Sequence, residues 1–193
     1  MKEKDMKEIS FAAGIIITLA AWALFRVADF VKNKKVDWKY EAWQIFFLIN
    51  LVVIVRFTFY PFSTVNGQVQ PLIFDAATAW PFRVNLVPFV NLLDYDSKRD
   101  LLINIIGNFA MFIPTGVMVP LIYKKRNTLL KVLLVGVGIS LIIEIIQLPF
   151  AVRASDVDDL ILNTAGCLTG YGFYALVRWI GNKVYCKTDS FAP

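Results

Sequence analysis

Histidine is absent from this sequence of 193 residues. It is the commonest general base and the commonest metal ligand in proteins, so its absence excludes the usual histidine-based catalytic and metal centres. Cysteine is scarce as well, with Cys167 inside an apolar run and Cys186 near the C-terminus. Two cysteines placed in this way do not support a disulfide framework. We therefore expect no redox chemistry, no metal ion and no cofactor.

Charged residues are also few, at 18% of the chain, whereas 58% of the residues are apolar. A soluble globular domain has about 25% charged and about 45–50% apolar residues, so this composition excludes an ordinary water-soluble fold. The 20 basic and 15 acidic residues give a net charge of +5. In so apolar a chain this excess indicates anionic lipid headgroups. No basic stripe is interleaved with aromatic residues, and we expect no binding to nucleic acid.

Five apolar runs are each long enough to cross a bilayer, whose hydrocarbon core of about 30 Å requires about 20 helical residues. They lie near residues 9–31, 41–60, 101–123, 128–150 and 160–182. The runs are continuous rather than alternating, and inside lipid only helices or closed barrels satisfy every backbone group. The sequence predicts an all-α membrane protein, a bundle of five transmembrane helices that forms a single domain over residues 1–193.

The first run has two interpretations. Basic residues precede it, and Ala21-Trp22-Ala23 resembles the cleavage site of a signal peptide. Acidic residues among the lysines, and the continuation of the run through Phe25, favour a retained anchor helix within residues 1–40.

Basic residues predict the orientation of the bundle. With five spans, the connections between runs 1 and 2 and between runs 3 and 4 lie on the same face as the C-terminus. This face carries more Lys and Arg than the other, including the compact turn Lys124-Lys125-Arg126. Because short cytoplasmic loops are enriched in basic residues, we expect the N-terminus outside the cell and the C-terminus in the cytoplasm.

The segment from Pro61 to Asp100 is the longest connection. It combines four prolines with aromatic side chains such as Trp80, Phe82 and Phe89. A solvated linker would be poorer in such residues, and aromatic rings suit the membrane interface. We expect a loop that lies in the outer interface and folds back over the bundle.

Polar side chains inside the apolar runs gather at one depth. Such groups are costly in hydrocarbon and therefore informative. Because successive spans alternate in direction, the ends of even runs and the starts of odd runs share one leaflet, on the same side as Asn85 and Arg153. The polar residues found there are Arg56, Asn104, Asn108, Glu144, Gln147 and Asn163.

The spacing within this set is helical. Asn104 and Asn108 are four residues apart, and Glu144 and Gln147 are three apart, so each pair projects from a single helix face. A third stripe with the same spacing consists of Asp156, Asp159 and Asn163. The three stripes predict one polar cavity between the helices.

The ionisable members of this set need partners inside the membrane. We expect Arg56 or Arg153 to pair with Glu144, and Asp156 or Asp159 to take the other arginine. The planar fork of arginine also holds phosphate, so these groups can bind an anionic lipid headgroup.

Simpler structural roles compete with this interpretation. The amides can serve as contacts between helices, and Arg153 and Asp156 as solvated turn charges. The small residues Gly166 and Gly170 favour close helix packing. At the other end of the first span, Arg26 and Asp29 are interpreted as a pair with no further role.

Four motifs carry a family resemblance. They are Asn85-Leu86-Val87-Pro88-Phe89, the run 104–116, Glu144-Ile145-Ile146-Gln147 and the run 153–166, which together cover about residues 41–175. In order and spacing the sequence resembles the VanZ-like family of bacterial membrane proteins. Thr115 stands where an apolar or small residue is expected. The resemblance implies a cell-envelope protein whose founding member is linked to low-level teicoplanin resistance, and it supplies no chemical mechanism.

The first function that these observations favour is binding. The candidate site would hold the polar head of an amphiphile, and loop 61–100 would cover it. The ligand would be a membrane lipid, a lipid-linked cell-wall precursor or a lipoglycopeptide. The candidate ligand-binding residues are Arg56, Asn85, Asn104, Asn108, Glu144, Gln147, Arg153, Asp156, Asp159 and Asn163.

The alternative is an intramembrane enzyme acting on a lipid-linked cell-wall or phospholipid substrate. Glu144, Asp156 or Asp159 would be the acid–base group, or Asp156, Asp158 and Asp159 would hold a divalent cation. The absence of histidine and of a transferase or phosphatase signature disfavours this enzyme. A third reading is a structural protein that stabilises a partner. A transporter is disfavoured because paired halves with broken helices are absent.

Overall fold

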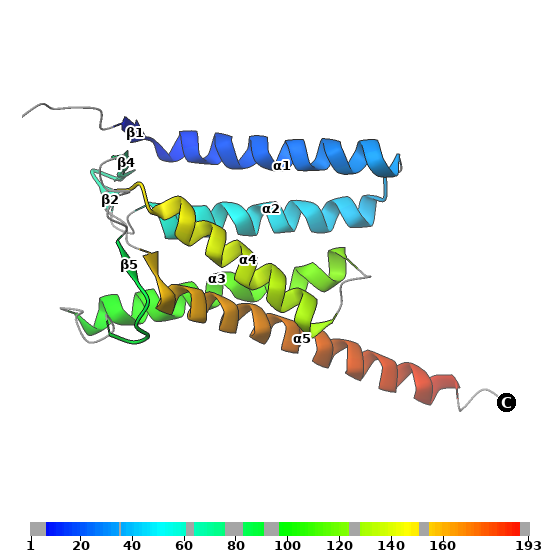
Figure 1. Cartoon of the computed structure of the whole chain (residues 1–193). Helices are drawn as coiled ribbons and strands as arrows, with labels where there is room; N and C mark the ends of the chain where they lie inside the picture. Colours follow the sequence, from blue (N-terminus) through cyan, green and yellow to red (C-terminus); the bar gives the residue numbers. More distant parts are fainter. Residues whose placement is uncertain are drawn as a thin grey trace, which may run out of the picture.

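The computed structural model describes residues 7–34, 36–60, 64–75, 83–90, 97–123, 128–150 and 155–189, with side chains through Lys183. Five helices, each long and apolar enough to span a membrane, run side by side and alternate in direction (Figure 1). They are α1 (Phe11–Asn33), α2 (Trp38–Phe59), α3 (Lys98–Ile122), α4 (Leu129–Gln147) and α5 (Val157–Asp189). The predicted bundle of five transmembrane helices is confirmed.

Short polar side chains fix where three of the helices begin. Ser10 accepts a hydrogen bond from the backbone N–H of Ala13 before α1, Asp37 accepts from Lys39 before α2, and Ser97 accepts from Arg99 before α3. Each satisfies a backbone donor that has no partner within the helix. Because these caps precede polar first turns, α2 and α3 begin three residues before the apolar runs that predicted them.

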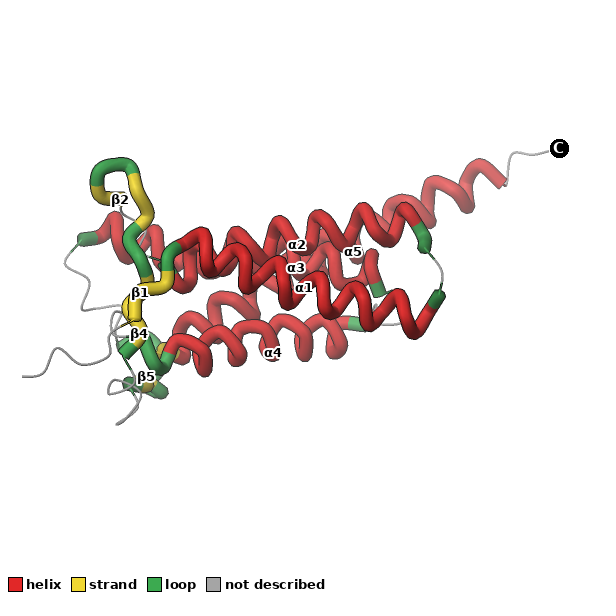
Figure 2. The backbone as a smooth tube through the Cα atoms, turned by 90° about the horizontal axis from the view of Figure 1, so that it is seen from above, coloured by secondary structure: helices red, strands yellow, loops and turns green. Residues whose placement is uncertain are grey.

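Among the described residues, six short strands lie at one end of the bundle (Figure 2). They are β1 (Lys7–Ile9), β2 (Thr64–Val65), β3 (Gln68–Val69), β4 (Leu72–Phe74), β5 (Val84–Asn85) and β6 (Ser155–Asp156). β1 pairs with β4 and β2 with β3 in antiparallel fashion, whereas β5 and β6 are parallel. Asn66 and Gly67, both with positive φ, form the turn between β2 and β3. Part of the long connection is therefore sheet.

The closest helix packing is between α3 and α5. A Cβ atom added to Gly166 or Gly170 would overlap the backbone carbonyl oxygens of Phe109 and Ile113, respectively. Gly116 of α3 meets the carbonyl of Cys167 in the same way. The packing role predicted for Gly166 and Gly170 is confirmed, because only residues without side chains allow two backbones to approach so closely.

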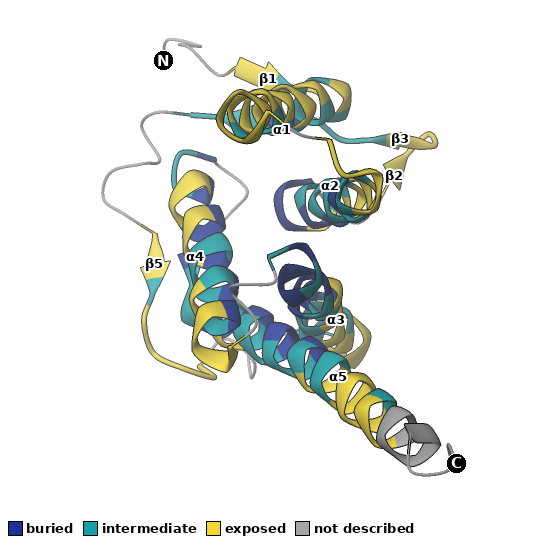
Figure 3. Cartoon of the chain, turned by 90° about the vertical axis from the view of Figure 1, so that its right-hand side faces the viewer, coloured by how far each residue is buried: buried dark blue, intermediate teal, exposed yellow. Residues whose placement is uncertain are grey.

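α1 lies at the edge of the bundle (Figure 3). None of its 23 residues, all of which the structure describes, is buried. Arg26 forms an ion pair with Asp29 at 2.5 Å and a second ion pair with Glu41 of α2, and its guanidinium lies over the ring of Tyr40. The prediction that Arg26 and Asp29 have no further role is wrong, because this pair connects α1 to α2.

Candidate functional site

The predicted polar residues come to the end of the bundle that carries the strands. α2 and α4 end there, and α3 and α5 begin there (Figures 1 and 2). The residues at this end are Arg56 in the last turn of α2, Asn104 and Asn108 in the first turns of α3, Glu144 and Gln147 in the last turns of α4, and Asn163 in the second turn of α5.

The carboxylate of Asp156 holds the start of α5. Its Oδ1 atom accepts the backbone N–H of Asp158 at 2.9 Å, which caps the helix, and the Nδ2 amide of Asn85 at 3.1 Å. The backbone N–H of Asp156 donates to Oε2 of Glu144 at 2.9 Å, and Glu144 is only 5% exposed. Two carboxylates therefore join α4, α5 and the β5 segment.

Asp158 attaches the β5 segment, residues 83–90, at a second point. Its Oδ1 atom accepts the backbone N–H of Phe89 at 2.8 Å. Phe89 has φ 66°, a left-handed conformation that is costly for a bulky residue and persists only where its surroundings impose it. The parallel pairing of β5 with β6, and a bond from Ser155 N–H to the Arg83 carbonyl, complete the attachment.

Other predicted residues connect helices pairwise. Nδ2 of Asn108 donates to Asp159 at 2.5 Å between α3 and α5. Nδ2 of Asn163 donates to the Ser140 hydroxyl at 2.9 Å between α5 and α4. Nε2 of Gln147 donates to the backbone carbonyl of Thr58 at 2.7 Å, which joins α4 to α2. The bonds of Gln147 and Asn163 are therefore contacts between helices, the simpler structural role considered for these amides.

Arg56 does not pair with Glu144, so the first of the two predicted partners of Glu144 is wrong. The guanidinium of Arg56 lies 5.7 Å from the ring centre of Phe11 in α1, and Nη1 donates to the carbonyl of Tyr60 at 3.4 Å. Glu144 instead accepts the backbone N–H of Asp156 at the start of α5. Arg153 lies outside the described residues, so its predicted pairing stays a prediction.

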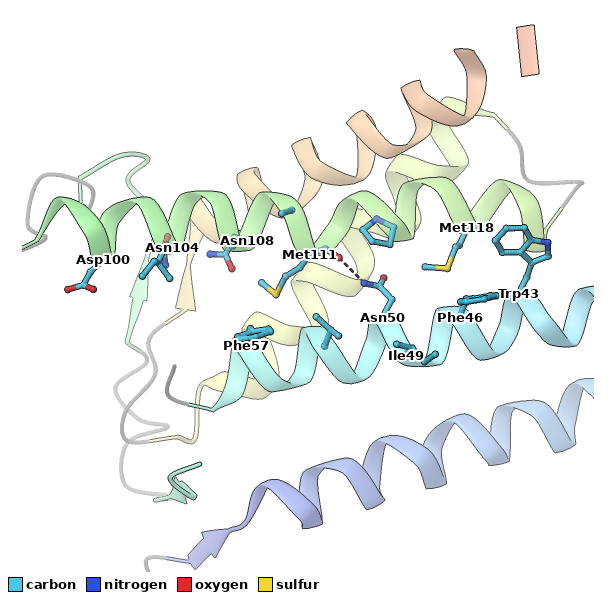
Figure 4. A pocket seen from close by; sticks show the side chains of 15 residues that line it. Trp43, Phe46, Ile49, Asn50, Phe57, Asp100, Asn104, Asn108, Met111 and Met118 are labelled. Atoms are coloured by element: carbon cyan, nitrogen blue, oxygen red, sulfur yellow. Dashed lines mark hydrogen bonds between the residues drawn. The ribbon is translucent and has the colours of Figure 1, made fainter. Parts of the chain in front are cut away.

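A groove of about 910 Å³ runs between α2 and α3 (Figure 4). Its polar end lies at the start of α3, where Asp100, Asn104 and Asn108 follow one another at intervals of one turn. The remaining length is almost entirely apolar, lined among others by Trp43, Phe46, Ile49, Val53, Phe57, Met111 and Met118. From Asp100 to Met118 the groove covers about 27 Å of helix, close to the hydrocarbon thickness of about 30 Å.

Two of the groove's polar side chains are available to a ligand. Within the described part of the chain, neither Asp100 nor Asn104 has a hydrogen-bond partner. Asn50, in the apolar part, is fully engaged: its Nδ2 donates to the carbonyl of Met111 at 2.9 Å, and its Oδ1 accepts the Thr115 hydroxyl at 2.7 Å. This bond explains the polar residue at position 115.

The three stripes contact one another, Glu144 with Asp156 and Asn108 with Asp159, but the groove is not a cavity shared by all of them. Of the predicted residues the groove contains Asn104 and Asn108, while the carboxylates of the α5 start face protein donors. Among the described residues no group of three or more acidic or cysteine side chains is arranged to hold a metal ion. One oxygen of each of Asp156, Asp158 and Asp159 accepts a hydrogen bond, from Asn85, Phe89 and Asn108 respectively, and the predicted cation site is not assembled among the described residues.

Sequence reasoning missed Asp100 and Asn50. Asp100 was interpreted as the end of a loop, although the Ser97 cap three residues earlier places it in the first turn of α3. Asn50 stands alone in the middle of an apolar run, and this isolated amide was the available signal.

The profile of the VanZ/LLP1 family matches residues 47–178. This chain belongs to that family. Protein VanZ from Enterococcus faecium is 37% identical to it over 93 residues, which make up 48% of this chain and 53% of that protein. The match therefore spans about half the length of this relative. No solved structure matches the chain.

The family match includes nearly all of the features described above. In this VanZ/LLP1 protein it begins inside α2, ends inside α5 and contains the polar end of the groove and the carboxylates at the α5 start. α1 lies outside the match. The family and the five apolar helices together make the chain a multi-pass membrane protein.

Proposed function

We propose that this protein binds an amphiphilic molecule in the groove between α2 and α3, and that this binding serves low-level resistance to glycopeptides of the teicoplanin type. The shape and polarity of the groove carry the proposal: three polar side chains at one end continue into an apolar channel about as long as the membrane is thick. The polar head of an amphiphile fits the first part, and its chain fits the second.

The volume of the groove supports a ligand of this kind. Binding sites for small molecules are clefts of about 300–1,000 Å³ that are mostly apolar and carry a few polar groups to orient the ligand. At about 910 Å³ the groove lies at the upper end of that range. The proposed role in glycopeptide resistance rests on membership of the VanZ/LLP1 family and on the 37% identity to protein VanZ.

The proposal includes an orientation, because glycopeptides act on cell-wall precursors outside the membrane. The strand end of the bundle, with the polar end of the groove, would face outward, as the excess of basic residues on the other face predicts. We expect a cysteine at exposed Thr64 of β2 to react with a membrane-impermeant maleimide in intact cells. A cysteine at exposed Lys39 of α2 should react only after permeabilisation. Both cysteines are introduced into a Cys186→Ser variant. The reverse labelling pattern would contradict this orientation.

Filling the groove should abolish binding. Gly107 lines the groove, and a Cβ atom placed there has no heavy atom of another element within 4 Å. The side chain of Gly107→Leu would occupy the space of the ligand without displacing protein. We expect the affinity for lipid to fall about tenfold or more, equivalent to about 1.4 kcal/mol. Native mass spectrometry of retained lipid, and the teicoplanin sensitivity of a susceptible host, would measure the effect.

Gly172→Leu is the matched control. Gly172 lies in α5, is exposed and likewise has open space around its Cβ position. Both changes replace a helical glycine by leucine, so both should raise helix propensity by up to about 1 kcal/mol. If Gly107→Leu and Gly172→Leu retain lipid and protect cells equally well, the groove is not the binding site.

A further inference from the structure

We propose that the groove selects a membrane lipid whose head ends in a primary ammonium, with the ammonium held by Asp100 and Asn104. This inference rests on the proposed function and names the class of ligand for the same groove. It differs from the expectation of an anionic head held by arginine, because the charge in the groove has the opposite sign.

Hydrogen-bond acceptors dominate the polar end. Asp100 offers two carboxylate oxygens, and Asn104 offers one amide oxygen. Asn108 donates one of its two Nδ2 N–H groups to Asp159, which leaves its Oδ1 atom and its second N–H for a ligand. The remaining donors are the two N–H groups of Asn104 and the second N–H of Asn108, and none of them is charged. A primary ammonium has three N–H donors and no acceptor, so its chemistry complements this set.

None of the described cations near the polar end lines the groove. Lys98 and Arg99 precede Asp100 directly, but they lie about 200° and 100° around the helix from it, and neither is among the residues that line the groove. Arg56 of α2 is also absent from the lining; its guanidinium lies 5.7 Å from the ring centre of Phe11 and 5.4 Å from that of Phe57, which lines the groove. Among the described residues, the only charge that lines the groove is the carboxylate of Asp100.

The order of the groups sets the orientation of the head. Asp100 is in the first turn of α3, and Asn104 and Asn108 follow along the helix toward the apolar part of the groove (Figure 4). Side chains four residues apart on a helix are about 5–6 Å apart, so one ammonium can contact Asp100 and Asn104 together. The rest of the head then lies beside Asn108, and the chain continues past Met111.

Three phospholipids with identical acyl chains test this inference. Phosphatidylethanolamine has an ammonium with N–H donors, phosphatidylcholine has the same charge without donors, and phosphatidylglycerol lacks the cation. We expect the detergent-purified full chain to bind phosphatidylethanolamine about tenfold more tightly than phosphatidylglycerol, with phosphatidylcholine between them. Native mass spectrometry of equimolar mixtures would measure the ratios.

Asp100→Asn should reduce this preference to about twofold or less, and Asp100→Glu, which keeps the charge, should retain most of it. Glu8→Gln is the matched control, since Glu8 is an exposed acid of β1 at the same end of the molecule. Thermal unfolding of each variant would exclude a general loss of structure as the cause.

The outcomes separate the two proposals. If Asp100→Asn keeps the preference for phosphatidylethanolamine, or if the unmodified chain shows none, the ammonium site is refuted. The groove itself would still stand, provided that Gly107→Leu lowers the binding of all three lipids. If Gly107→Leu leaves the binding of all three unchanged, the proposed function fails first.

Discussion

Replacing Gly166 by alanine is expected to prevent stable assembly of α3 with α5. The added Cβ atom would overlap the backbone carbonyl of Phe109, and a backbone cannot move aside as the end of a flexible side chain can. Overpacking of a core typically costs 1–3 kcal/mol, and we expect about 3 kcal/mol or more here because the clash is with main chain. Thermal unfolding in detergent and the yield of folded protein would measure the loss.

Gly172→Ala is the control for this substitution. Gly172 lies six residues further along α5, where a Cβ atom meets nothing within 4 Å. Both variants gain helix propensity, so Gly172→Ala should be as stable as the unmodified chain or slightly more stable. Equal stability of Gly166→Ala and Gly172→Ala would show that α3 and α5 do not approach as closely as described.

The prediction of the fold succeeded because it needed only local information. The length of each apolar run determines whether it can cross the membrane, and the alternation of direction follows from the number of spans. The same two facts place Glu144 and Asn104 at one end of the bundle. Gly166 and Gly170 could be interpreted correctly because small residues four apart on one face favour close packing whatever the partner.

The contacts within the site could not be predicted in the same way. Which neighbour a side chain meets depends on the rotation of each helix about its axis, which the sequence does not specify. Gln147 illustrates this point, since it binds the carbonyl of Thr58, one of the last four in α2 that have no partner within the helix. Every residue has a backbone carbonyl, so the residue types do not indicate which carbonyl accepts a hydrogen bond from a side chain.

The role of Asp156 was more accessible to sequence reasoning. An aspartate directly before an apolar helical run is a typical N-cap, and the structure has Asp156 in that position. Interpreting it chiefly as a ligand-binding or catalytic carboxylate overlooked the need of the α5 start for an acceptor. Arg56 shows the reverse difficulty, because Phe11, one of the residues it contacts, belongs to α1, a helix that the polar stripes gave no reason to consider.

Substitutions of Glu144 distinguish a structural role of this carboxylate from a catalytic one. Glu144→Ala would leave the backbone N–H of Asp156 without its acceptor at a partly buried position, beside the site of a side chain that is only 5% exposed. A buried donor without a partner costs about 1–3 kcal/mol. We expect Glu144→Ala to lower the unfolding temperature and to release the attachment of residues 83–90, which limited proteolysis would detect.

Glu144→Gln distinguishes the two roles, because glutamine keeps the volume and one acceptor oxygen of glutamate but loses its charge and its basicity. If Glu144 serves as the acceptor for Asp156, the Gln variant should retain most of the stability and of the resistance, whereas the Ala variant loses both. If Glu144 were a general base, Gln would be as inactive as Ala despite being folded. A stable Glu144→Gln protein that gives no resistance would therefore favour the intramembrane enzyme over the binding protein.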